Sequence, residues 1–310
     1  MSSAVVFGYH NVGVRCLRVL LARGVRVALV VTHPDNPGEN IWFGSVAAVA
    51  AEHRIPCITP DDPNAPEIVA RIAALQPDFL FSFYYRSMLK AQLLALPRLG
   101  ALNMHGSLLP KYRGRVPVNW AIIHGETDTG ATLHYMTEKP DNGDIVAQTR
   151  VPILPDDTAG EVFEKVSVAA ELTLFDALPA LIAGNAPRVR QDLSQGGYFG
   201  GRRPDDGRID WTQPAARVHN LVRALAPPYP GAFTDLPDGR LVIARTRLEN
   251  IDGGNNRRPS ARLRCADGRL YADCVAGTLE ILSATLDGRP LAAAGFEQRF
   301  GLSISLVDDR

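Results

Sequence analysis

Two polar side chains with complementary chemistry lie two residues apart, about one third of the way along the chain. Asn103 and His105 follow a short apolar run, so both side chains should leave the same face of an extended backbone where a predicted strand ends. A neutral amide donor beside an imidazole can stabilise a developing oxyanion and transfer a proton. We expect Gly106 to let the chain turn sharply after the strand. Asn and His also occur as ordinary loop caps, so this pair alone only suggests an oxyanion-and-proton site.

A carboxylate that can complete such a site is Asp141. It lies in the turn-prone segment Glu138–Asp144, between two stretches with the alternation typical of strands. A carboxylate that reaches His105 would fix the orientation of the imidazole ring and favour its protonated form. Because aspartates are also common in turns without any catalytic role, this interpretation depends on His105 lying close by. We expect Asn103, His105 and Asp141 to be the catalytic residues.

Before residue 190 the sequence alternates between apolar strand-like runs and helix-length amphipathic segments. The predicted strands are Ala4–Gly8, Val25–Thr32, Phe79–Phe83, Ala101–Met104, Thr132–Met136 and Asp144–Val151. The predicted helices are Val12–Arg23, Ser45–His53, Pro66–Leu75 and Thr158–Ala183. Strands that alternate with helices of this length predict a mostly parallel sheet with helices on both faces. We therefore expect an α/β fold in which residues 1–190 form a Rossmann-like catalytic domain.

The rest of the sequence has a different pattern. Gly184–Asp206 is rich in Gly, Pro, Gln and Arg with little periodicity, and we expect residues 191–206 to form a linker. One more helix is predicted over Pro214–Leu225. Short β-type runs then alternate with Gly and Asp turns, over Gly239–Leu248, Ser260–Cys265, Leu270–Cys274 and Thr278–Thr285. This pattern predicts a small β-barrel-like (OB-like) C-terminal domain over residues 207–310.

Composition and charge exclude several classes of function. Lys and Arg total 33 and Asp and Glu total 33, so the formal net charge is zero, which disfavours a broad nucleic-acid or membrane surface. The four cysteines have no CxxC spacing and no HExxH occurs, so we expect neither a disulfide framework nor a metal site. There is no signal-peptide core and no apolar run of the roughly 18–20 residues that a membrane helix needs. We expect a cytoplasmic protein with no membrane insertion.

Other motifs carry less information. Gly8–Gly13 (GYHNVG) follows the first predicted strand but lacks GxGxxG, so we favour a tight turn over nicotinamide binding, although its His10 lies where ligands of parallel sheets bind. No P-loop and no GxSxG is present, so we expect Ser107 to form hydrogen bonds within its loop rather than to act as a nucleophile. The remaining histidines are expected to be surface or core residues: His33, His53, His124, His134 and His219.

The loop HGSLLPKYRG, the Asn-x-His pair and Asp141 together resemble the folate-dependent formyltransferase family, which includes glycinamide ribonucleotide and methionyl-tRNA formyltransferases. Its members place Asn, His and Asp around the formyl carbon, and these roles would fall to Asn103, His105 and Asp141. The resemblance continues through GETDTG at Gly125–Gly130 and into the carboxy-terminal half, where similar enzymes have a small β-barrel domain. It implies that 10-formyltetrahydrofolate is the formyl donor and that an amine is the acceptor.

The resemblance also implies where the folate would lie. Its pterin ring should contact the backbone near one loop and be closed in by the turn that contains Asp141, with Phe83 and Tyr84 shaping the pocket. The implied folate-binding residues are Ser87, Met88, Leu89, Arg115, Thr137, Glu138, Lys139, Pro140 and Asp141.

Several further segments are similar to one branch of the family. They are THPDNPGE (Thr32–Glu39), FGSVA (Phe43–Ala47), FSFYYR (Phe81–Arg86) and PxPGAF (Pro228–Phe233). That branch formylates UDP-4-amino-4-deoxy-L-arabinose in the lipid A pathway of polymyxin resistance, so the resemblance implies a UDP-amino sugar as the acceptor. The branch is often fused to a decarboxylase; the chain would be a free-standing formyltransferase or part of a longer protein. By charge alone, the candidates to hold a diphosphate are Lys111, Arg113, Arg202 and Arg203.

Three alternatives stay open. Methionyl-tRNA formyltransferases carry a basic loop after the second strand, whereas residues 33–44 contain Asp35 and Glu39 but no Lys or Arg, which disfavours a tRNA acceptor. A formyltetrahydrofolate deformylase would use the same three residues with water as the acceptor. A non-enzymatic nucleotide-binding domain is disfavoured by the presence of all three polar residues. The amino sugar, the nucleotide and the existence of a homo-oligomer are left open by the sequence.

Overall fold

The computed structural model describes residues 1–249 and 260–306 and divides into two compact units. The first unit comprises Met1–Pro117, Asp128–Pro152 and Phe163–Gly200. The second comprises Val118–Thr127, Ile153–Val162 and Gly201–Arg310. Each unit is built around its own seven-stranded sheet.

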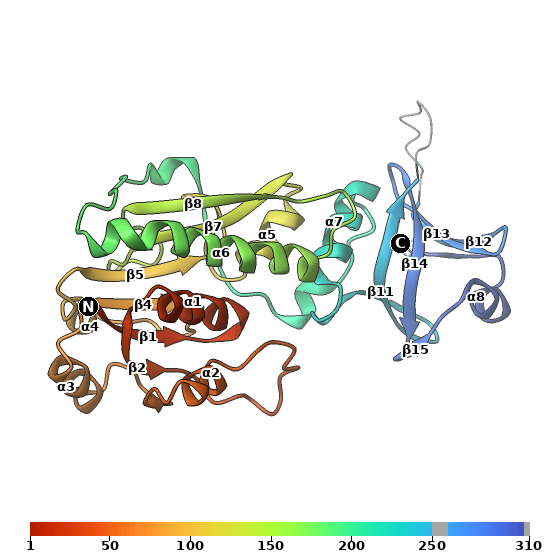
Figure 1. Cartoon of the computed structure of the whole chain (residues 1–310). Coiled ribbons are helices and arrows are strands. Elements are labelled where there is room, and N and C mark those ends of the chain that lie inside the picture. The colour runs from red at the N-terminus through yellow and green to blue at the C-terminus, as the bar shows by residue number, and fades with distance from the viewer. Residues whose placement is uncertain (250–259, 307–310) are drawn as a thin grey trace. The chain divides into compact units, whose positions relative to one another are not determined.

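The sheet of the first unit is mostly parallel and has the order β3-β2-β1-β4-β5-β7-β8 (Figure 1). Its strands are β1 (Ser3–Gly8), β2 (Arg26–Val31), β3 (Cys57–Ile58), β4 (Phe79–Phe83), β5 (Gly100–His105), β7 (Asp128–Tyr135) and β8 (Ile145–Pro152). The pairs from β3 to β5 are parallel, and β7 and β8 are added antiparallel. The predicted α/β class with a mostly parallel sheet is confirmed.

Helices cover both faces of this sheet, as its continuous apolar strands require. Val5 and Phe7 of β1 point into a core formed with the helices α3 and α4, while Val6, between them, is equally buried on the opposite face. On that opposite face α1 and α6 run side by side, linked by the ion pair of Arg15 with Glu171 at 2.6 Å (Figure 1). The helices of this part of the chain are α1 (His10–Ala22), α2 (Val46–Glu52), α3 (Pro66–Ala74), α4 (Ala91–Leu94), α5 (Pro117–Ile123) and α6 (Ala159–Ile182).

The predicted boundaries agree with the structure to within a few residues, but several short elements were not predicted. The two-residue strand β3 and the four-residue helix α4 are too short to show any periodicity. A second pair of two-residue strands, β6 (Arg113–Gly114) and β9 (Tyr198–Phe199), joins segments more than 80 residues apart. Such pairing depends on tertiary contacts that local sequence does not reveal.

The second unit contains an antiparallel sheet with the order β10-β11-β14-β13-β12-β16, which confirms the predicted β-rich C-terminal domain. Its strands are β10 (Ala232–Leu236), β11 (Gly239–Leu248), β12 (Arg262–Ala266), β13 (Arg269–Asp273), β14 (Thr278–Leu286), β15 (Arg289–Pro290) and β16 (Ser303–Ser305). Helices α7 (Ala215–Leu225) and α8 (Ala293–Phe300) close the core of this sheet through Val222 and Phe296, both fully buried. Across residues 1–249 and 260–306, every helix is too short or too polar to cross a membrane.

The central strand β4 should dominate the stability of the first unit. Phe81 is fully buried and stacks between Phe79 and Phe83, with ring centroids 5.4 and 5.5 Å away. We expect Phe81→Ala to lower the free energy of unfolding by about 3–5 kcal/mol, because it removes a large buried side chain and leaves a cavity. Urea denaturation followed by far-UV circular dichroism measures the loss. As a control, Leu172→Ala, at a side chain on α6 that is 48% exposed, should cost less than about 1 kcal/mol; equal losses would contradict this account.

Candidate active site

The strand pair β5–β7 brings the first polar groups of the site together. Asn103 of β5 lies directly opposite His134 of β7 in the antiparallel register, and their Nδ2 and Nε2 atoms are 3.1 Å apart. Opposite residues of an antiparallel pair project from the same face of the sheet, so both side chains point toward the turn that follows β7. His134 is only 1% exposed.

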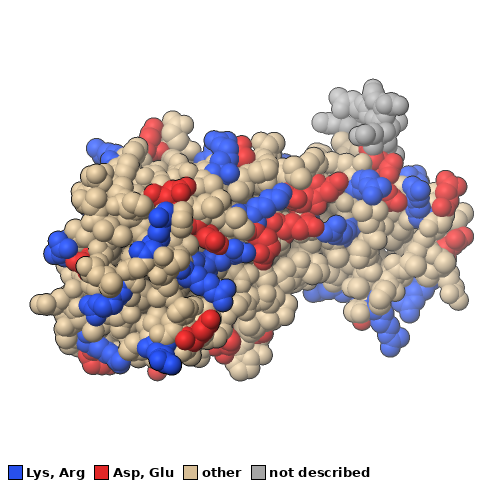
Figure 2. All heavy atoms as spheres, viewed as in Figure 1, with Lys and Arg blue, Asp and Glu red and all other residues tan. Residues whose placement is uncertain are grey.

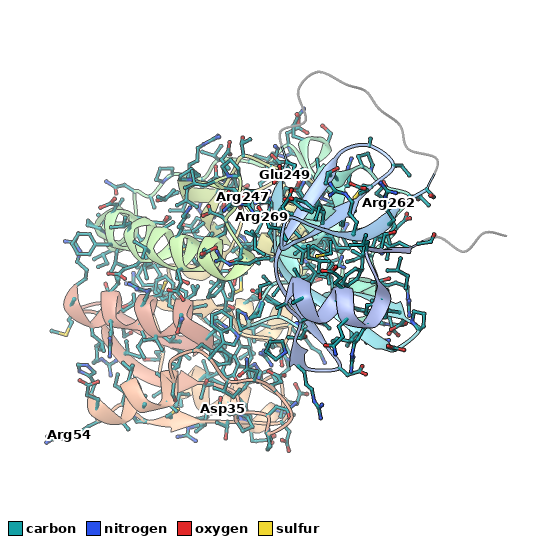
Figure 3. All side chains as sticks on the ribbon, turned by 90° about the vertical axis from the view of Figure 1, so that its right-hand side faces the viewer. Asp35, Arg54, Arg247, Glu249, Arg262 and Arg269 are labelled. Carbon is teal, nitrogen blue, oxygen red and sulfur yellow. The ribbon has the colours of Figure 1, made fainter. Side chains whose placement is uncertain are left out.

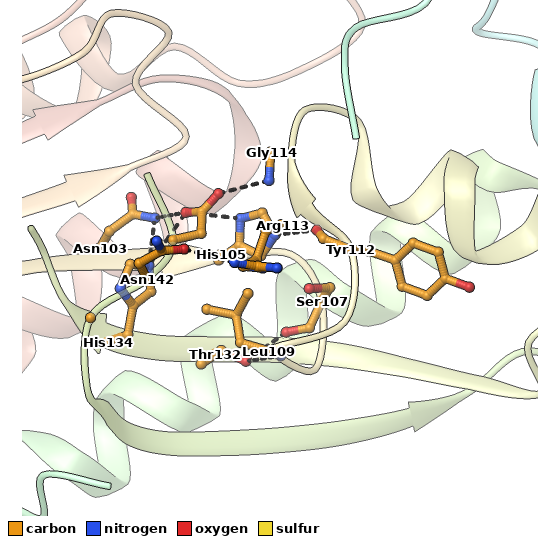
Figure 4. A network of polar contacts seen from close by, with 12 residues as sticks. Asn103, His105, Ser107, Leu109, Tyr112, Arg113, Gly114, Thr132, His134 and Asn142 are labelled. Carbon is orange, nitrogen blue, oxygen red and sulfur yellow. Dashed lines mark hydrogen bonds and ion pairs between the residues drawn. The ribbon is translucent and has the colours of Figure 1, made fainter. Parts of the chain in front are cut away.

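The carboxylate of Asp141 contacts Asn103, His105, His134 and Gly114, whose positions Figure 4 shows. Its Oδ1 lies 3.5 Å from Nδ1 of His105, 3.5 Å from Nε2 of His134 and 3.5 Å from Nδ2 of Asn103. Its Oδ2 accepts a hydrogen bond of 2.8 Å from the backbone N–H of Gly114. The structure therefore brings the three predicted catalytic residues together around one carboxylate.

Both nitrogens of the His105 ring face hydrogen-bond acceptors. Nε2 lies 2.8 Å from the carbonyl oxygen of Tyr112, and Nδ1 faces Asp141. A carbonyl oxygen can only accept, so Nε2 carries a proton, and a second proton on Nδ1 would satisfy the carboxylate as well. The ring, which is only 6% exposed, is thus held in one orientation by an acceptor at each nitrogen.

The carboxylate of Asp141 is held in its ionised form. Burial works to raise its pKa, but attraction to the His105 ring, the contacts with His134 and the hydrogen bond from the Gly114 N–H outweigh burial and hold the pKa well below its ordinary value. Asp141 is therefore a permanent negative charge at any pH near neutrality. It cannot itself act as a proton donor there.

The turn that carries Asp141 is strained and is fixed by a residue from a distant part of the chain. Asp141 has a left-handed backbone with φ 56°, a conformation that Asp tolerates better than most residues. The buried side chain of Gln191 donates from Nε2 to the carbonyl oxygens of Asp141, at 3.0 Å, and Gly143, at 2.7 Å. Gln191 thereby provides hydrogen-bond donors for two carbonyl groups of the turn that would otherwise lack partners.

The loop on the other side of Asp141 is fixed by the same distant segment. Gly114, the donor to Asp141, belongs to β6, which pairs in parallel with β9. Arg113 of β6 donates to the side chain of Asn142 at 2.9 Å and to the carbonyl oxygen of Gly196 at 3.3 Å. The turn that carries Asp141 and the β6 segment that donates to it are thus both held by residues between Gln191 and Phe199.

The loop after β5 folds back on the sheet through polar contacts. The hydroxyl of Thr132 donates to the carbonyl oxygen of Ser107 at 2.6 Å and accepts the N–H of Leu109 at 3.1 Å. Ser107 is fully buried and donates to the carbonyl oxygen of Lys111 at 2.6 Å, so it has the structural role expected of it. The chain bends at Gly106, as predicted, and a Cβ atom there would also collide with the hydroxyl of Tyr84 unless that side chain moved.

The residues implied in folate binding lie in three segments of the first unit. Ser87, Met88 and Leu89 follow β4, and the side chain of Met88 is 53% exposed. The segment Thr137–Pro140 forms the mostly exposed start of the Asp141 turn, where the Thr137 hydroxyl donates to the carbonyl oxygen of Lys139. Arg115 follows β6 with an exposed side chain, while its backbone N–H is bonded to Phe199.

His134 and Gln191 are site residues that sequence reasoning did not identify. His134 was expected to be an ordinary surface or core histidine; it is buried, but its Nε2 contacts both Asn103 and Asp141. The only signal in the sequence is that His134 lies on a predicted strand just before the Asp141 turn, and the strand register that places it opposite Asn103 could not be deduced. Gln191 gave no signal at all.

The sequence also suggested His10 as a ligand-binding residue and four cations as diphosphate-binding residues. His10, at the mouth of the sheet, stacks on Phe43 at a centroid distance of 3.9 Å, and burial lowers its pKa to about 3, so it is a neutral side chain. Of the four cations considered for a diphosphate, Arg113 is bonded within the protein as described above. Lys111 lies in the first unit with it, whereas Arg202 and Arg203 belong to the second.

The depressed pKa of Asp141 predicts a pH dependence of stability. The ionised carboxylate stabilises the folded state at every pH above the pKa of an unfolded Asp, about 3.9, and this contribution is lost as the pH falls toward the lower pKa of the folded state. We expect Asp141→Asn to lower the free energy of unfolding by roughly 1.5–3 kcal/mol at pH 5.5, with the difference from wild type shrinking toward pH 3. Urea titrations at pH 5.5, 4.5, 3.5 and 3.0 test this. A difference that grows on acidification would contradict it.

Comparison with known protein families matches both parts of the chain. Residues 5–178 match the family described as formyl transferase, and residues 202–300 match its C-terminal domain. The first match alone includes more than half of the chain and contains Asn103, His105 and Asp141.

Solved structures share the fold. The N-formyltransferase from Helicobacter canadensis, in complex with folinic acid and dTDP-3-aminofucose, has a TM-score of 0.71 and 21% identity over 91% of this chain and 98% of its own. WlaRD, a sugar 3N-formyltransferase crystallised with dTDP and 5-N-formyl-THF, has a TM-score of 0.72 and 20% identity over 93% and 99%. HypX from Aquifex aeolicus in complex with tetrahydrofolic acid has a TM-score of 0.63 and 18% identity over 96% and 47%. With both family models matched in order along a chain of the same fold, this protein belongs to the formyl transferase family and is a formyltransferase.

Proposed function

We propose that this formyltransferase moves the formyl group of 10-formyltetrahydrofolate onto the 4-amine of a nucleotide-linked amino sugar, and that UDP-4-amino-4-deoxy-L-arabinose is the acceptor. The observation that carries the proposal is the buried cluster of Asn103, His105 and Asp141 at the end of β5 in a member of this family. The folates bound to the N-formyltransferase from Helicobacter canadensis and to HypX support the donor, and the dTDP-aminofucose of the former supports a nucleotide amino sugar. The reaction would occur in the cytoplasm and serve lipid A modification and polymyxin resistance.

The first step is attack by the neutral amine of the sugar on the formyl carbon. A new C–N bond forms as the carbonyl π electrons move to oxygen, which gives a tetrahedral oxyanion. Asn103 and the protonated His105 are the donors that would stabilise this charge. In the structure their N–H groups are bonded to Asp141, His134 and the carbonyl oxygen of Tyr112, so each would exchange one of these contacts for the oxyanion.

The second step breaks the bond between the formyl carbon and N10 of the folate. N10 leaves with its electron pair and must gain a proton, while the former amine must lose one. His105 is placed to give a proton to N10 and to regain it from the new amide nitrogen through water. Asp141 would stay ionised throughout. Its carboxylate would keep the His105 ring oriented and stabilise the imidazolium form of that ring.

The loop at residues 33–44 supports a small acceptor rather than RNA. Its two acidic side chains are engaged within the protein: Asp35 accepts from the hydroxyl of Tyr9 at 2.9 Å, and Glu39 accepts two hydrogen bonds from Arg86 at 2.8 and 2.9 Å. The loop contributes no Lys or Arg that could hold phosphates of an RNA backbone.

Charges on the surface of the second unit are also balanced. Arg247 and Arg269, which lie near Glu249 (Figure 3), both approach the side chain of Glu280, at 3.6 and 3.7 Å. Arg262 is paired with the buried Asp273 at 3.0 Å. On the face drawn in Figure 2, cationic and anionic side chains are interspersed. Because these three arginines are paired with acidic side chains, they are less available to a polyanion, which supports a small nucleotide sugar as the acceptor.

The acceptor is tested by an assay of formyl transfer from 10-formyltetrahydrofolate to a panel of amines. The panel contains UDP-4-amino-4-deoxy-L-arabinose, dTDP-linked 3-amino and 4-amino sugars, and methionyl-tRNA, and products are identified by mass change. We expect kcat/KM to be highest with the UDP sugar. Preferred use of methionyl-tRNA would refute a sugar acceptor, and release of formate without any amine would instead indicate a deformylase.

Substitution of the proposed proton-transfer residue tests the mechanism. We expect His105→Gln to lower kcat by about 10²–10⁴, the typical contribution of a general acid or base, because glutamine keeps a neutral hydrogen-bond donor but cannot transfer a proton. The matched control is His53→Gln, an exposed histidine at the end of α2, which should retain wild-type turnover. Near-wild-type turnover of His105→Gln, measured with saturating substrates, would exclude the mechanism.

A further inference from the structure

The segment between β4 and α4 has an unusual set of free peptide groups. The backbone N–H groups of Ser87, Met88 and Leu89 have no hydrogen-bond partner among residues 1–249 and 260–306, nor do the carbonyl oxygens of Ser87 and Leu89. Free backbone groups in a row form a surface that can pair with a flat heterocycle carrying adjacent donors and acceptors, as a pterin does. Met88, whose side chain is half exposed, adds an apolar surface beside them.

The remaining peptide groups of this segment are taken up by side chains. Asn64, from the loop before α3, donates from Nδ2 to the carbonyl oxygen of Met88 at 2.9 Å and accepts the N–H of Lys90 at its Oδ1 at 2.7 Å. His33 accepts the N–H of Arg86 at 3.0 Å. The amide of Asn64 therefore donates to one residue of the segment and accepts from the residue two positions later. A neighbouring parallel strand would bond one edge of the segment in the same way.

Asn64 is itself fixed in place. Its backbone N–H donates to Oδ1 of Asp62 at 2.9 Å, and its Nδ2 also lies 3.2 Å from that oxygen. These hydrogen bonds lower the pKa of Asp62, so the acceptor stays ionised. Pro63, which lies between Asp62 and Asn64, is buried, and α3 begins at Pro66, two residues after Asn64. The orientation of the amide is determined by its partners, because only Nδ2 can donate to a carbonyl oxygen and only Oδ1 can accept an N–H.

We propose that Asn64 is a positioning residue for the formyl donor. Asn64 bonds Met88 and Lys90 along one edge of this segment. It thereby orients the free peptide groups of residues 87–89 toward a pterin ring bound along the opposite edge. Asn64 does not touch the reacting atoms, and its effect is on donor binding rather than on chemistry. This inference rests on the proposed function, since it assigns the donor-binding role to these peptide groups.

Direct binding measurements on two variants test the proposal. Asn64→Ala removes both hydrogen bonds, whereas Asn64→Asp keeps the acceptor for Lys90 but turns a second anionic oxygen toward the carbonyl of Met88. We expect both variants to raise the Kd for 5-formyltetrahydrofolate about tenfold, equivalent to about 1.4 kcal/mol, and to raise KM for the donor similarly with kcat little changed. The Kd for UDP, measured by calorimetry in the same preparations, should not change.

A control and a second measurement separate positioning from folding. Asp210→Ala removes another side chain that holds a backbone N–H, that of Thr212 at 2.9 Å, and should leave the folate Kd at its wild-type value. In the wild-type protein, amide hydrogen exchange should be slow at Lys90 without ligand, and 5-formyltetrahydrofolate should slow it at residues 87–89.

The outcomes distinguish this inference from the proposed function. Unchanged folate Kd values in both Asn64 variants, or equal losses of folate and UDP binding, would overturn the role of Asn64 and leave the formyl transfer intact. Ligand-free exchange at Lys90 as fast as at residues 87–89 would overturn it as well, even if neither variant folds. A wild-type protein that binds no folate, while it still binds UDP, would overturn the proposed function itself.

Discussion

A carboxylate removed from water must be given partners, and the partners of Asp141 come from three separate parts of the chain. His105 and Asn103 are supplied by β5, His134 by β7, and the N–H of Gly114 by β6, at the end of the HGSLLPKYRG motif. The ionised form of Asp141 persists because these contacts outweigh the unfavourable effect of burial. Since Asp141 also contacts the side chains of Asn103 and His105, the geometry of the proposed catalytic site depends on this one buried ion.

The sheet explains why these groups can meet. Parallel strands end at one edge, and β5 is the last parallel strand before the antiparallel pair formed by β7 and β8. Because β7 runs antiparallel to β5, its last residue, Tyr135, lies opposite Leu102, and the turn that follows folds back so that Asp141 contacts Asn103 and His105. The segment from Gln191 to Phe199 then fixes the turn by side-chain hydrogen bonds and by the β6–β9 pair. Because that segment follows α6, the site is complete only when residues of the first unit far apart in sequence are in place.

The donor and acceptor ends of the proposed reaction differ in how the protein would recognise them. For the folate, the proposed contacts are peptide N–H and C=O groups of residues 87–89, which are uncharged and have no hydrogen-bond partner among residues 1–249 and 260–306. For the acceptor, the nearby loop at residues 33–44 is held by Glu39 with Arg86 and by Asp35 with Tyr9, and its net charge is negative. An acceptor of modest size fits this arrangement better than an RNA whose binding requires many cations.

The sequence by itself determined the fold class and three residues of the site. Apolar runs and amphipathic periodicity depend on local spacing, so β4 (Phe79–Phe83) and β11 (Gly239–Leu248) were predicted at their observed boundaries. Asn103, His105 and Asp141 could be proposed because their residue types and the motif around them are visible in one short stretch each, and the structure brings the three together. The bend at Gly106 follows β5 as predicted, whereas its close approach to the Tyr84 hydroxyl involves a residue that follows β4 and left no signal in the sequence.

Only the tertiary structure decided which further residues join the site. His134 depends on the register of β5 against β7, and Gln191 and Asn64 depend on loops that approach backbone groups many residues away. These side chains bond peptide groups or a buried carboxylate that come within reach only after the chain has folded. The physical reason is that hydrogen bonding between distant segments leaves no periodic or local pattern in the sequence, whereas burial against a sheet or helix does.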